Sequence, residues 1–332
     1  MSPTRLTRMA ALLVCCGACL AEAKTITVAT DGSGDFKTLQ EAVAAAPDKG
    51  PERIIIHIKA GTYQGPVIVP KAKPNVSFEG EDAATTIITC DKNVNDPIPA
   101  GSDKFNPAVQ IVGDDFRAEK LTIQNTSGDH GQALAMRLDS DRVVVKNCRL
   151  LGWQDTLMVN NGRQYFESTY IEGRVDFIYG SGTAVFDRCT IHSKNGGYVT
   201  AASTPQDHPF GFVFLNCKLT GDDVPWQAPP GTPNVKPSKP SKPTYLGRPW
   251  RPYGSVSFIG CELGDHIRPE GWHNWGKAEN EKTARYAEYG NTGPGAKADK
   301  RVTWSKQLTK EEANHITVEK VLGGSDGWKP GA

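Results

Sequence analysis

From Arg53 onward the chain alternates short apolar, β-branched runs with residues that form turns. The turns are rich in Gly, Pro, Asn and Asp, and no long amphipathic helix separates the runs. A doubly wound α/β sheet needs such helices between its strands, so the pattern argues against that class. A β-sandwich, a propeller and a parallel solenoid remain. The runs read RIIIHIKAG, GPVIVP, NVSFEG, TTIITC, AVQIVG and KLTIQN.

An internal repeat decides among these three architectures. Five segments share an apolar run, two mostly polar or small positions, a Cys or Thr, one further residue, and Leu or Ile. They are VVVKNCRL (143–150), QYFESTYI (164–171), VFDRCTI (185–191), VFLNCKL (213–219) and SFIGCEL (257–263). A sixth segment, AEKLTIQ (118–124), fits with Leu in the Cys position. The resulting column is Leu121, Cys148, Thr169, Cys189, Cys217 and Cys261.

The spacing of this column indicates an all-β chain folded as a parallel β-helix. Successive members are 27, 21, 20, 28 and 44 residues apart, which suits coils of about 20 residues carrying loops of variable length. A propeller blade needs about 40 residues at a more constant period. On this interpretation the column points inward, and its cysteines are small apolar side chains rather than a disulfide framework.

Two capping boxes predict the few helices. Thr38-x-x-Glu41 precedes AVAAAP, which predicts one short helix that ends at Pro47 and caps the open end of the stack. Thr309-x-x-Glu312 has the same spacing near the end of the chain. It predicts a last helix in an aromatic, polar C-terminal tail.

The first residues have the form of an export signal. Arg5 and Arg8 precede the apolar stretch from Met9 to Leu20, and Ala21-Glu22-Ala23 offers a cleavage site. The apolar stretch is too short to span a bilayer, which disfavours a retained membrane anchor. Three cysteines there raise a lipoprotein alternative, although no convincing lipobox precedes them. We therefore expect residues 1–23 to be a signal peptide and the protein to be secreted, without membrane attachment after cleavage.

Residues 24–332 are expected to form a single β-helical catalytic domain and to act as a monomer. One stretch, 222–243, breaks the repeat and is rich in Pro and Lys, which predicts an exposed, partly extended loop. The loop could be a rim that meets an acidic substrate, or merely a solvated insertion.

Charge and cysteine usage narrow the class of protein. The 332 residues carry 38 Lys+Arg and 37 Asp+Glu, a net charge of +1, which argues against a dedicated nucleic-acid binder. Five of the eight cysteines follow the signal segment, an odd number, so at least one thiol is unpaired within a monomer. No Cys-x-x-Cys motif or Cys/His cluster indicates a metal site, and we expect no cofactor.

Two aspartates occupy equivalent places on consecutive coils. Asp155 lies seven residues after Cys148, and Asp176 lies seven residues after Thr169. Neighbouring parallel strands are about 4.8 Å apart, so the two carboxyl groups are expected to be stacked. Such a pair titrates as a coupled unit, in which one group holds a proton and the other is a ready nucleophile or base. The alternative is a structural pair of aspartates that cap turns.

Several other residues could complete a reaction site around this pair. Arg248 could hold a carboxylate through a bidentate contact, and the amides of Gln132 and Gln154 could stabilise an oxyanion. Aromatic rings of the kind on which sugars stack are offered by Trp250, Tyr179 and Trp153. Each has a plain structural alternative, namely a turn arginine, a surface amide or a core ring.

At these residues the chain resembles the pectin methylesterase (pectinesterase) family. The resemblance rests on GQALAMRL, GWQDTL, GRVDFIYG, VFDRC and YLGRPWRPYG, with VATDGSGDFKTLQEAV and AEYGNTGPGA near the two ends. It covers nearly all of the chain after the signal segment. The resemblance implies a right-handed parallel β-helix that acts on methyl-esterified pectin (homogalacturonan) without a metal or organic cofactor.

The resemblance also implies a role for each site residue. Asp176 would be the nucleophile, and Asp155 would be the proton donor and later the base. Gln154 and Gln132 would stabilise the oxyanion, and Arg248 would orient Asp176 and meet the substrate. Among the aromatic residues, Trp250 would pack on a galacturonate ring. Tyr179, which stands where the family usually has Phe, would also contact the substrate.

Some positions depart from the family pattern. Thr169 replaces a cysteine that often pairs with the position of Cys189, so the corresponding disulfide is expected to be absent. Lys104, before Phe105, replaces a Thr of plant-type members, and Gly65 replaces a frequent Glu.

Two alternative functions stay open at this point. One is a β-helix glycosidase that cleaves polygalacturonan, in which inverting catalysis would need carboxyl groups about 6.5–9.5 Å apart. The other is a non-catalytic carbohydrate-binding solenoid, which would leave Asp155, Asp176 and Arg248 unexplained.

Overall fold

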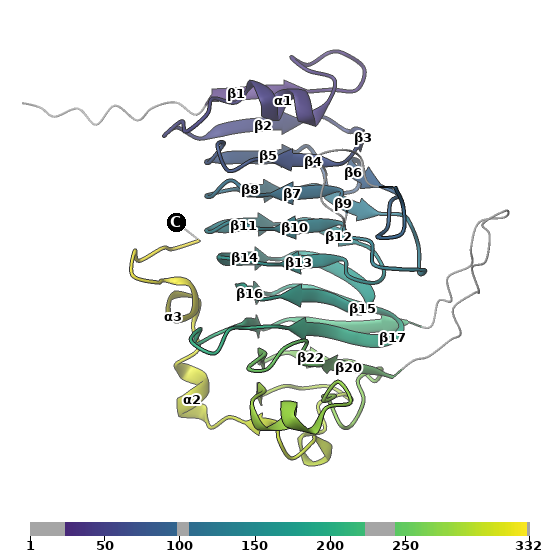
Figure 1. Cartoon of the computed structure of the whole chain (residues 1–332), viewed down its shortest axis with the longest axis vertical. Helices are drawn as coiled ribbons and strands as arrows, with labels where there is room; N and C mark the ends of the chain where they lie inside the picture. The colour runs from purple at the N-terminus through teal and green to yellow at the C-terminus, as the bar shows by residue number, and fades with distance from the viewer. Residues whose placement is uncertain (1–23, 98–105, 223–242, 331–332) are drawn as a thin grey trace, which may run out of the picture.

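The structure is a computed structural model, and it describes residues 24–97, 106–222 and 243–330. These residues wind into a stack of parallel coils, with the N-terminal coil at one end and the C-terminal coils at the other (Figure 1). Every strand pairing between named strands is parallel. Together with the few short helices, this confirms the expected all-β parallel β-helix.

The strands form three ladders along the stack. The first is an 11-stranded sheet of β1 (Lys24–Val28), β2 (Ile54–Ile58), β5 (Val76–Gly80), β8 (Arg117–Glu119), β11 (Val143–Lys146), β14 (Arg163–Glu167), β16 (Thr183–Asp187), β18 (Phe212–Leu215), β21 (Ser255–Ile259), β23 (Arg285–Tyr289) and β24 (Lys306–Gln307). The second contains β3 (Gly61–Gln64), β6 (Thr86–Cys90), β9 (Thr122–Asn125), β12 (Arg149–Leu151), β15 (Tyr170–Gly180), β17 (Thr190–Ala202), β19 (Lys218–Asp222) and β22 (Glu262–Leu263). The third contains β4 (Val67–Val69), β7 (Val109–Ile111), β10 (Met136–Leu138), β13 (Leu157–Val159), the later halves of β15 and β17, and β20 (Thr244–Gly247).

The repeat column lies where it was expected. Strand register places its members side by side on successive coils, because Arg149 pairs with Thr122 and Tyr170, and Thr190 pairs with Lys218. All six members are buried. The five described cysteines are free thiols, so the inward stack is confirmed and Cys189 has no disulfide partner among the described residues.

The two polar positions before each column residue make a corner of the coil. The residue directly before the column adopts a left-handed backbone with φ between 49° and 64° on every one of these coils. Asn and Gly reach this conformation most easily, and other residues do so at some cost. The corner residues are Lys120, Asn147, Ser168, Arg188, Asn216 and Gly260.

A row of phenylalanines fills the interior beside the first ladder. Phe166, Phe186, Phe214 and Phe258 come from consecutive coils, and their nearly parallel ring planes have centroids 4.7, 4.5 and 4.3 Å apart. All four are fully buried. Removing each ring from water stabilises the fold by about 1.5–3 kcal/mol, which makes this row a main source of coil-to-coil cohesion.

The helices lie outside the stack. Both capping boxes are present, at α1 (Leu39–Ala45) and α2 (Lys310–Asn314). Three further short elements were not predicted from the sequence. They are α3 (Val318–Leu322), which packs against β14 and β16, and two 3-10 turns, η1 (Ala278–Lys282) and η2 (Ala298–Lys300). After α3 the C-terminal segment runs back along the stack (Figure 1).

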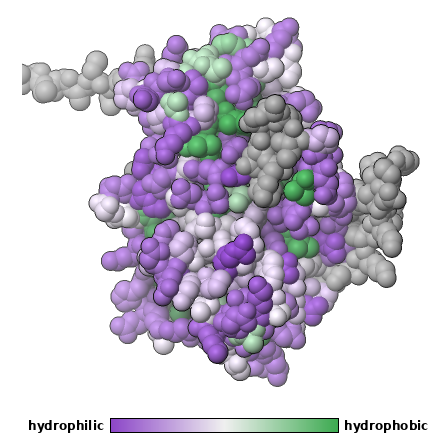
Figure 2. Space-filling view, viewed as in Figure 1, coloured by the Kyte–Doolittle hydropathy of each residue, from purple (hydrophilic) through white to green (hydrophobic). Residues whose placement is uncertain are grey.

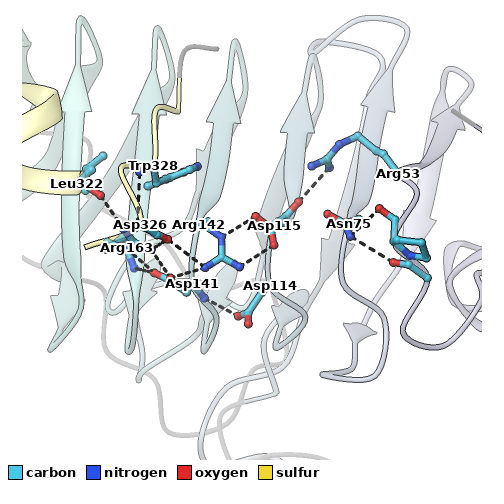
Figure 3. Close-up of polar contacts among 12 residues, drawn as sticks. Arg53, Asn75, Asp114, Asp115, Asp141, Arg142, Arg163, Leu322, Asp326 and Trp328 are labelled. Carbon is cyan, nitrogen blue, oxygen red and sulfur yellow. Dashed lines mark hydrogen bonds and ion pairs between the residues drawn. The ribbon is translucent and has the colours of Figure 1, made fainter. Parts of the chain in front are cut away.

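Arg163 fastens this segment to the coils. Its guanidinium donates to both carboxylate oxygens of Asp141 and of Asp326, and to the carbonyl of Leu322 (Figure 3). Arg142, which directly precedes β11, binds Asp115 and Asp141. A ladder of charges therefore follows one corner of the coils.

Three expectations fall on residues outside the described ranges, namely the signal peptide 1–23, Lys104 with Phe105, and the loop 222–243 apart from its two ends. Within the described ranges, no helix has the length and apolar character needed to cross a bilayer. The face shown in Figure 2 is mostly hydrophilic, with small green areas mainly over the N-terminal coils.

Candidate active site

Asp155 and Asp176 face each other across neighbouring coils. Leu157 pairs with Ile178, so the residues two positions earlier also lie opposite each other, and the Asp155 amide donates to the Val175 carbonyl at 3.1 Å. Both aspartates have left-handed backbones, with φ of 64° and 52°. Aspartate tolerates this region better than most residues, because its short polar side chain bonds locally.

A β-bulge aims Asp176 away from the core. Val175 pairs with Tyr198, and Ile178 pairs with Thr200, so two residues of β15 lie opposite one residue of β17. Phe177 is fully buried, whereas Asp176 is 7% exposed and lines a cavity. Bulges commonly redirect a side chain next to an active site.

Arg248 meets Asp176 from the segment that follows β20. Its Nε lies 2.9 Å from Oδ1 and its Nη2 lies 2.8 Å from Oδ2, a bidentate contact. The two side chains are 18% and 10% exposed, so water screens the pair little. The family resemblance suggested this contact, although 72 residues separate the partners.

The two carboxyl groups have different proton affinities. Burial raises the pKa of Asp176, and its hydrogen bonds and charge attraction to Arg248 oppose that rise. Burial also raises the pKa of Asp155 well above the ordinary value of 3.8, and the nearby charge of Asp176 adds to the increase. Asp176 therefore ionises first, while Asp155 keeps its proton.

The two glutamines lie beside the pair. Gln132 and Gln154 form a parallel bridge on consecutive coils, and the amide of Ala133 donates to the Gln154 carbonyl at 3.1 Å. Both side chains line a cavity of about 410 Å³ that also contains the two carboxyl groups. Its lining residues are Val94, Gln132, Gln154, Asp155, Asp176, Tyr179, Ala201, Arg248, Trp250 and Trp275.

Seven of the eight residues proposed from the sequence thus reach one cavity, and the eighth, Trp153, is not among its lining residues. The Trp153 ring is covered instead by the Lys194 ammonium at 3.9 Å. Sequence reasoning missed Val94, Ala201 and Trp275. Only Trp275 gave a signal, as part of the aromatic stretch GWHNW.

Aromatic rings form one wall of the cavity. The rings of Tyr179 and Trp250 meet edge to face, with centroids 5.8 Å apart and planes at 68°. Together with Trp275 they pack around Met158 and Ala201. Such a wall offers flat apolar faces beside the charged pair.

Comparison with known proteins identifies the family. A family model described as Pectinesterase matches residues 25–325. The chain belongs to the pectinesterase family. Pectinesterase 31 of Arabidopsis thaliana is 38% identical over 306 residues, which cover 90% of this chain and 92% of that relative. Pectinesterase 2 of the same plant is 42% identical over 314 residues, but the match spans only 51% of that longer protein.

Solved pectinesterases share the fold. Pectin methylesterase from carrot is 37% identical, with a TM-score of 0.81 over 92% of this chain and 95% of the carrot chain. The enzyme from Erwinia chrysanthemi is 28% identical, with a TM-score of 0.76 over 93% and 99% of the two chains. Pectinesterases are carboxylic-ester hydrolases, so membership makes this chain an esterase and sets aside the glycosidase and the binding solenoid.

The described residues contain no group of three or more His, Cys, Asp or Glu arranged to hold a metal ion. The lining side chains that carry polar groups supply two carboxyls, two carboxamides, one guanidinium, one phenol and two indoles. These groups can supply a nucleophile, a proton and oxyanion donors.

Proposed function

We propose that this pectinesterase hydrolyses the C6 methyl esters of methyl-esterified homogalacturonan through an acyl-enzyme on Asp176. The observation that carries the proposal is the bidentate contact between Asp176 and Arg248 beside a carboxyl group of higher pKa. Arg248 keeps Asp176 ionised, and Asp155 keeps the proton that a leaving methoxide needs. The pair therefore begins the reaction in complementary states.

In the first half-reaction, a carboxylate oxygen of Asp176 attacks the C6 carbonyl carbon. The carbonyl oxygen becomes an oxyanion, to which the side-chain amides of Gln132 and Gln154 donate hydrogen bonds. As the tetrahedral intermediate collapses, the bond to the methoxy oxygen breaks. Asp155 gives its proton to that oxygen, methanol leaves, and C6 remains bound to Asp176 as a mixed anhydride.

In the second half-reaction, Asp155 is a carboxylate and acts as the base. It takes a proton from a water molecule, whose oxygen attacks C6 of the acyl-enzyme. The same two amides stabilise the second oxyanion. Collapse breaks the bond to Asp176 and leaves a free C6 carboxyl on the sugar, while Asp155 again holds a proton.

The aromatic wall supports a polymeric sugar substrate. Trp250 and Tyr179 line the cavity beside the carboxyl pair, and in the proposed complex they contact the ring that carries the reacting ester. Two solved structures of pectin methylesterase, each 28% identical to this chain, are described as complexes with hexasaccharides. We propose that residues 24–332 act as one catalytic unit and as a monomer on pectin outside the cell, after removal of residues 1–23.

The experiment compares methanol release from methylated pectin by the protein and by Asp176→Asn. Asparagine keeps the side-chain size and tolerates the positive φ, so the fold is retained. We expect methanol release and acidification without new reducing ends, and a loss of at least about 10³-fold in the variant. Turnover by Asp176→Asn at the native rate would remove Asp176 as the nucleophile. New reducing ends would point to glycosidic cleavage instead.

A further inference from the structure

Two aromatic rings lie against the guanidinium of Arg248. Its central carbon is 3.8 Å from the ring centroid of Tyr198 and 3.8 Å from that of Trp275. Trp275 lines the cavity, whereas Tyr198 is not among the described residues that line it. Tyr198 belongs to β17, on the coil after Asp176, and the reaction outlined above gives it no role.

We propose that Tyr198 is a positioning residue for ester hydrolysis, whose ring fixes the plane of the Arg248 guanidinium that binds Asp176. The inference rests on the proposed role of Asp176 as the nucleophile. Tyr198 acts through Arg248, and it contacts neither the ester nor the reacting carboxylate.

The bidentate contact explains why the plane matters. Two parallel N–H···O bonds form only when the guanidinium and the carboxylate are nearly coplanar. A ring stacked on the guanidinium restricts its rotation and keeps water from its face. Without that ring, Arg248 can tilt and exchange one carboxylate bond for water. Asp176 would then lose part of the charge interaction that opposes its burial.

Tyr198 is itself held in place by the next coil. Its ring stacks on that of Tyr245, with centroids 5.3 Å apart and planes 10° apart, and the two residues are directly paired in β17 and β20. The Arg268 guanidinium lies 4.8 Å from the Tyr245 ring. The four side chains therefore form one stack in the order Arg248, Tyr198, Tyr245 and Arg268, and Arg248 is at the end that binds Asp176.

Three other titratable groups lie near Arg248 or Asp176, and their protonation bears on how a pH profile is interpreted. The His273 ring lies 5.6 Å from that of Tyr198, and burial together with the charges of Arg248 and Arg268 lowers the pKa of His273. Buried Tyr286 has a pKa raised well above its ordinary value, so it stays neutral. Asp155 faces Asp176 from the preceding coil. A change in the acid side of the pH profile therefore reports on Asp176 and its contact with Arg248.

The test uses three variants of the full chain in a methanol-release assay on methylated pectin across pH. Tyr198→Leu removes the ring at similar volume, and Tyr198→Phe keeps it. Tyr170→Leu is the matched control, because Tyr170 is an aromatic residue of β15 with an arginine, Arg149, 5.7 Å from its ring and no contact with Asp176. Thermal unfolding of each variant shows whether it is folded.

We expect Tyr198→Leu to lower kcat about tenfold with KM within about twofold, and to move the acid limb of kcat/KM to higher pH. Tyr198→Phe is expected to restore the native profile. An unchanged acid limb in Tyr198→Leu, or the same shift in Tyr170→Leu, would overturn the inference. If the proposed function is wrong, the result is different: the native protein releases no methanol, or the Asp176→Asn variant still releases it. Either result would also overturn the inference about Tyr198.

Discussion

At the scale of single residues, the two aspartates of the candidate site lower the free energy of unfolding, and contacts around them must offset that loss. Asp155 and Asp176 are both buried, both left-handed, and close enough for one charge to raise the pKa of the other. Each left-handed non-glycine residue costs of order 1 kcal/mol, and burial of a charge costs more. Arg248 hydrogen-bonds Asp176 directly but acts on Asp155 through its charge alone, so the two aspartates contribute differently to stability.

Asp155→Asn is therefore expected to stabilise the fold while it removes activity. The folded pKa of Asp155 is raised, so between pH 3.8 and that raised value the folded state binds more protons than the unfolded state. The free energy of unfolding falls there as pH increases, by about 1.4 kcal/mol per pH unit. Asparagine has no such dependence. The variant should unfold at least about 2–4 °C higher at pH 7, with the gain vanishing below pH 3.8.

Thermal unfolding followed by circular dichroism at several pH values measures this difference. Asp207→Asn serves as the control, because it makes the same change on an exposed side chain. A lower melting temperature for Asp155→Asn at pH 7 would mean that the Asp155 carboxylate is stabilised in the folded state, contrary to the raised pKa.

At the scale of elements, the sequence predicted the register of the coils but not their local backbone. Equal spacings of 21 residues place Asp155 opposite Asp176, because each residue added to one coil must be absorbed by a loop or a bulge before the strands pair again. The bulge at Asp176 left no signal, since one extra residue in VDFIYG does not alter an apolar run. The approach of Arg248 depends on how the coils turn, so only the family resemblance suggested it.

The C-terminal elements show another limit of sequence reasoning. Thr309 and Glu312 form a recognisable capping box and gave α2, whereas α3 begins at a lone Thr317 cap and spans only five residues. Such a short helix is stable because Val321 and Leu322 are buried against the first ladder, a tertiary contact that periodicity cannot reveal.

Arg163→Ala is expected to loosen the C-terminal segment without altering the coils. The variant loses the contacts to Asp326 and to the Leu322 carbonyl. Amide hydrogen exchange in residues 318–328 should become about tenfold faster, while exchange in β10 and β13 stays unchanged. Mass spectrometry of peptic fragments measures both regions.

The same contact gives a pH dependence in the unaltered protein. Arg163 lowers the pKa of Asp326, so the contribution of their contact to the stability of the segment is present above the ordinary pKa of 3.8 and is lost as the pH falls through the lowered value.

Lys329→Ala, which removes a nearby exposed cation, is the control for the exchange experiment on Arg163→Ala. Slow exchange of residues 318–328 in Arg163→Ala would show that the burial of α3 alone holds the segment.

At the scale of the whole molecule, one apolar interior runs through the described coils. A single cluster of buried residues extends from Ile26 in the first strand to Tyr286 in β23. A solenoid can unfold from an end, because each coil contacts only its neighbours. Continuous rows such as the stacked phenylalanines favour unfolding as one unit instead, since separating two coils exposes both faces of a row.

The five cysteines allow this cooperativity to be measured along the axis. They are all buried members of the same interior cluster, and they lie at positions from Cys90 in β6 to Cys261 beside β22. Burial raises the pKa of Cys148, Cys217 and Cys261, which further suppresses the reactive thiolates in the folded state. Each thiol should therefore react with an alkylating reagent only after its own coil opens.

We expect all five to be alkylated in denaturant without prior reduction, and to share one midpoint of guanidinium concentration within about 0.3 M. Peptide mapping after brief exposure to iodoacetamide at increasing denaturant gives a midpoint for each cysteine. A prior reduction step is the control, and it should change nothing. If Cys90 reacted at clearly lower denaturant than Cys189, the N-terminal coils would open separately from the rest. If Cys189 reacted only after reduction, it would have a disulfide partner, contrary to the free thiol column.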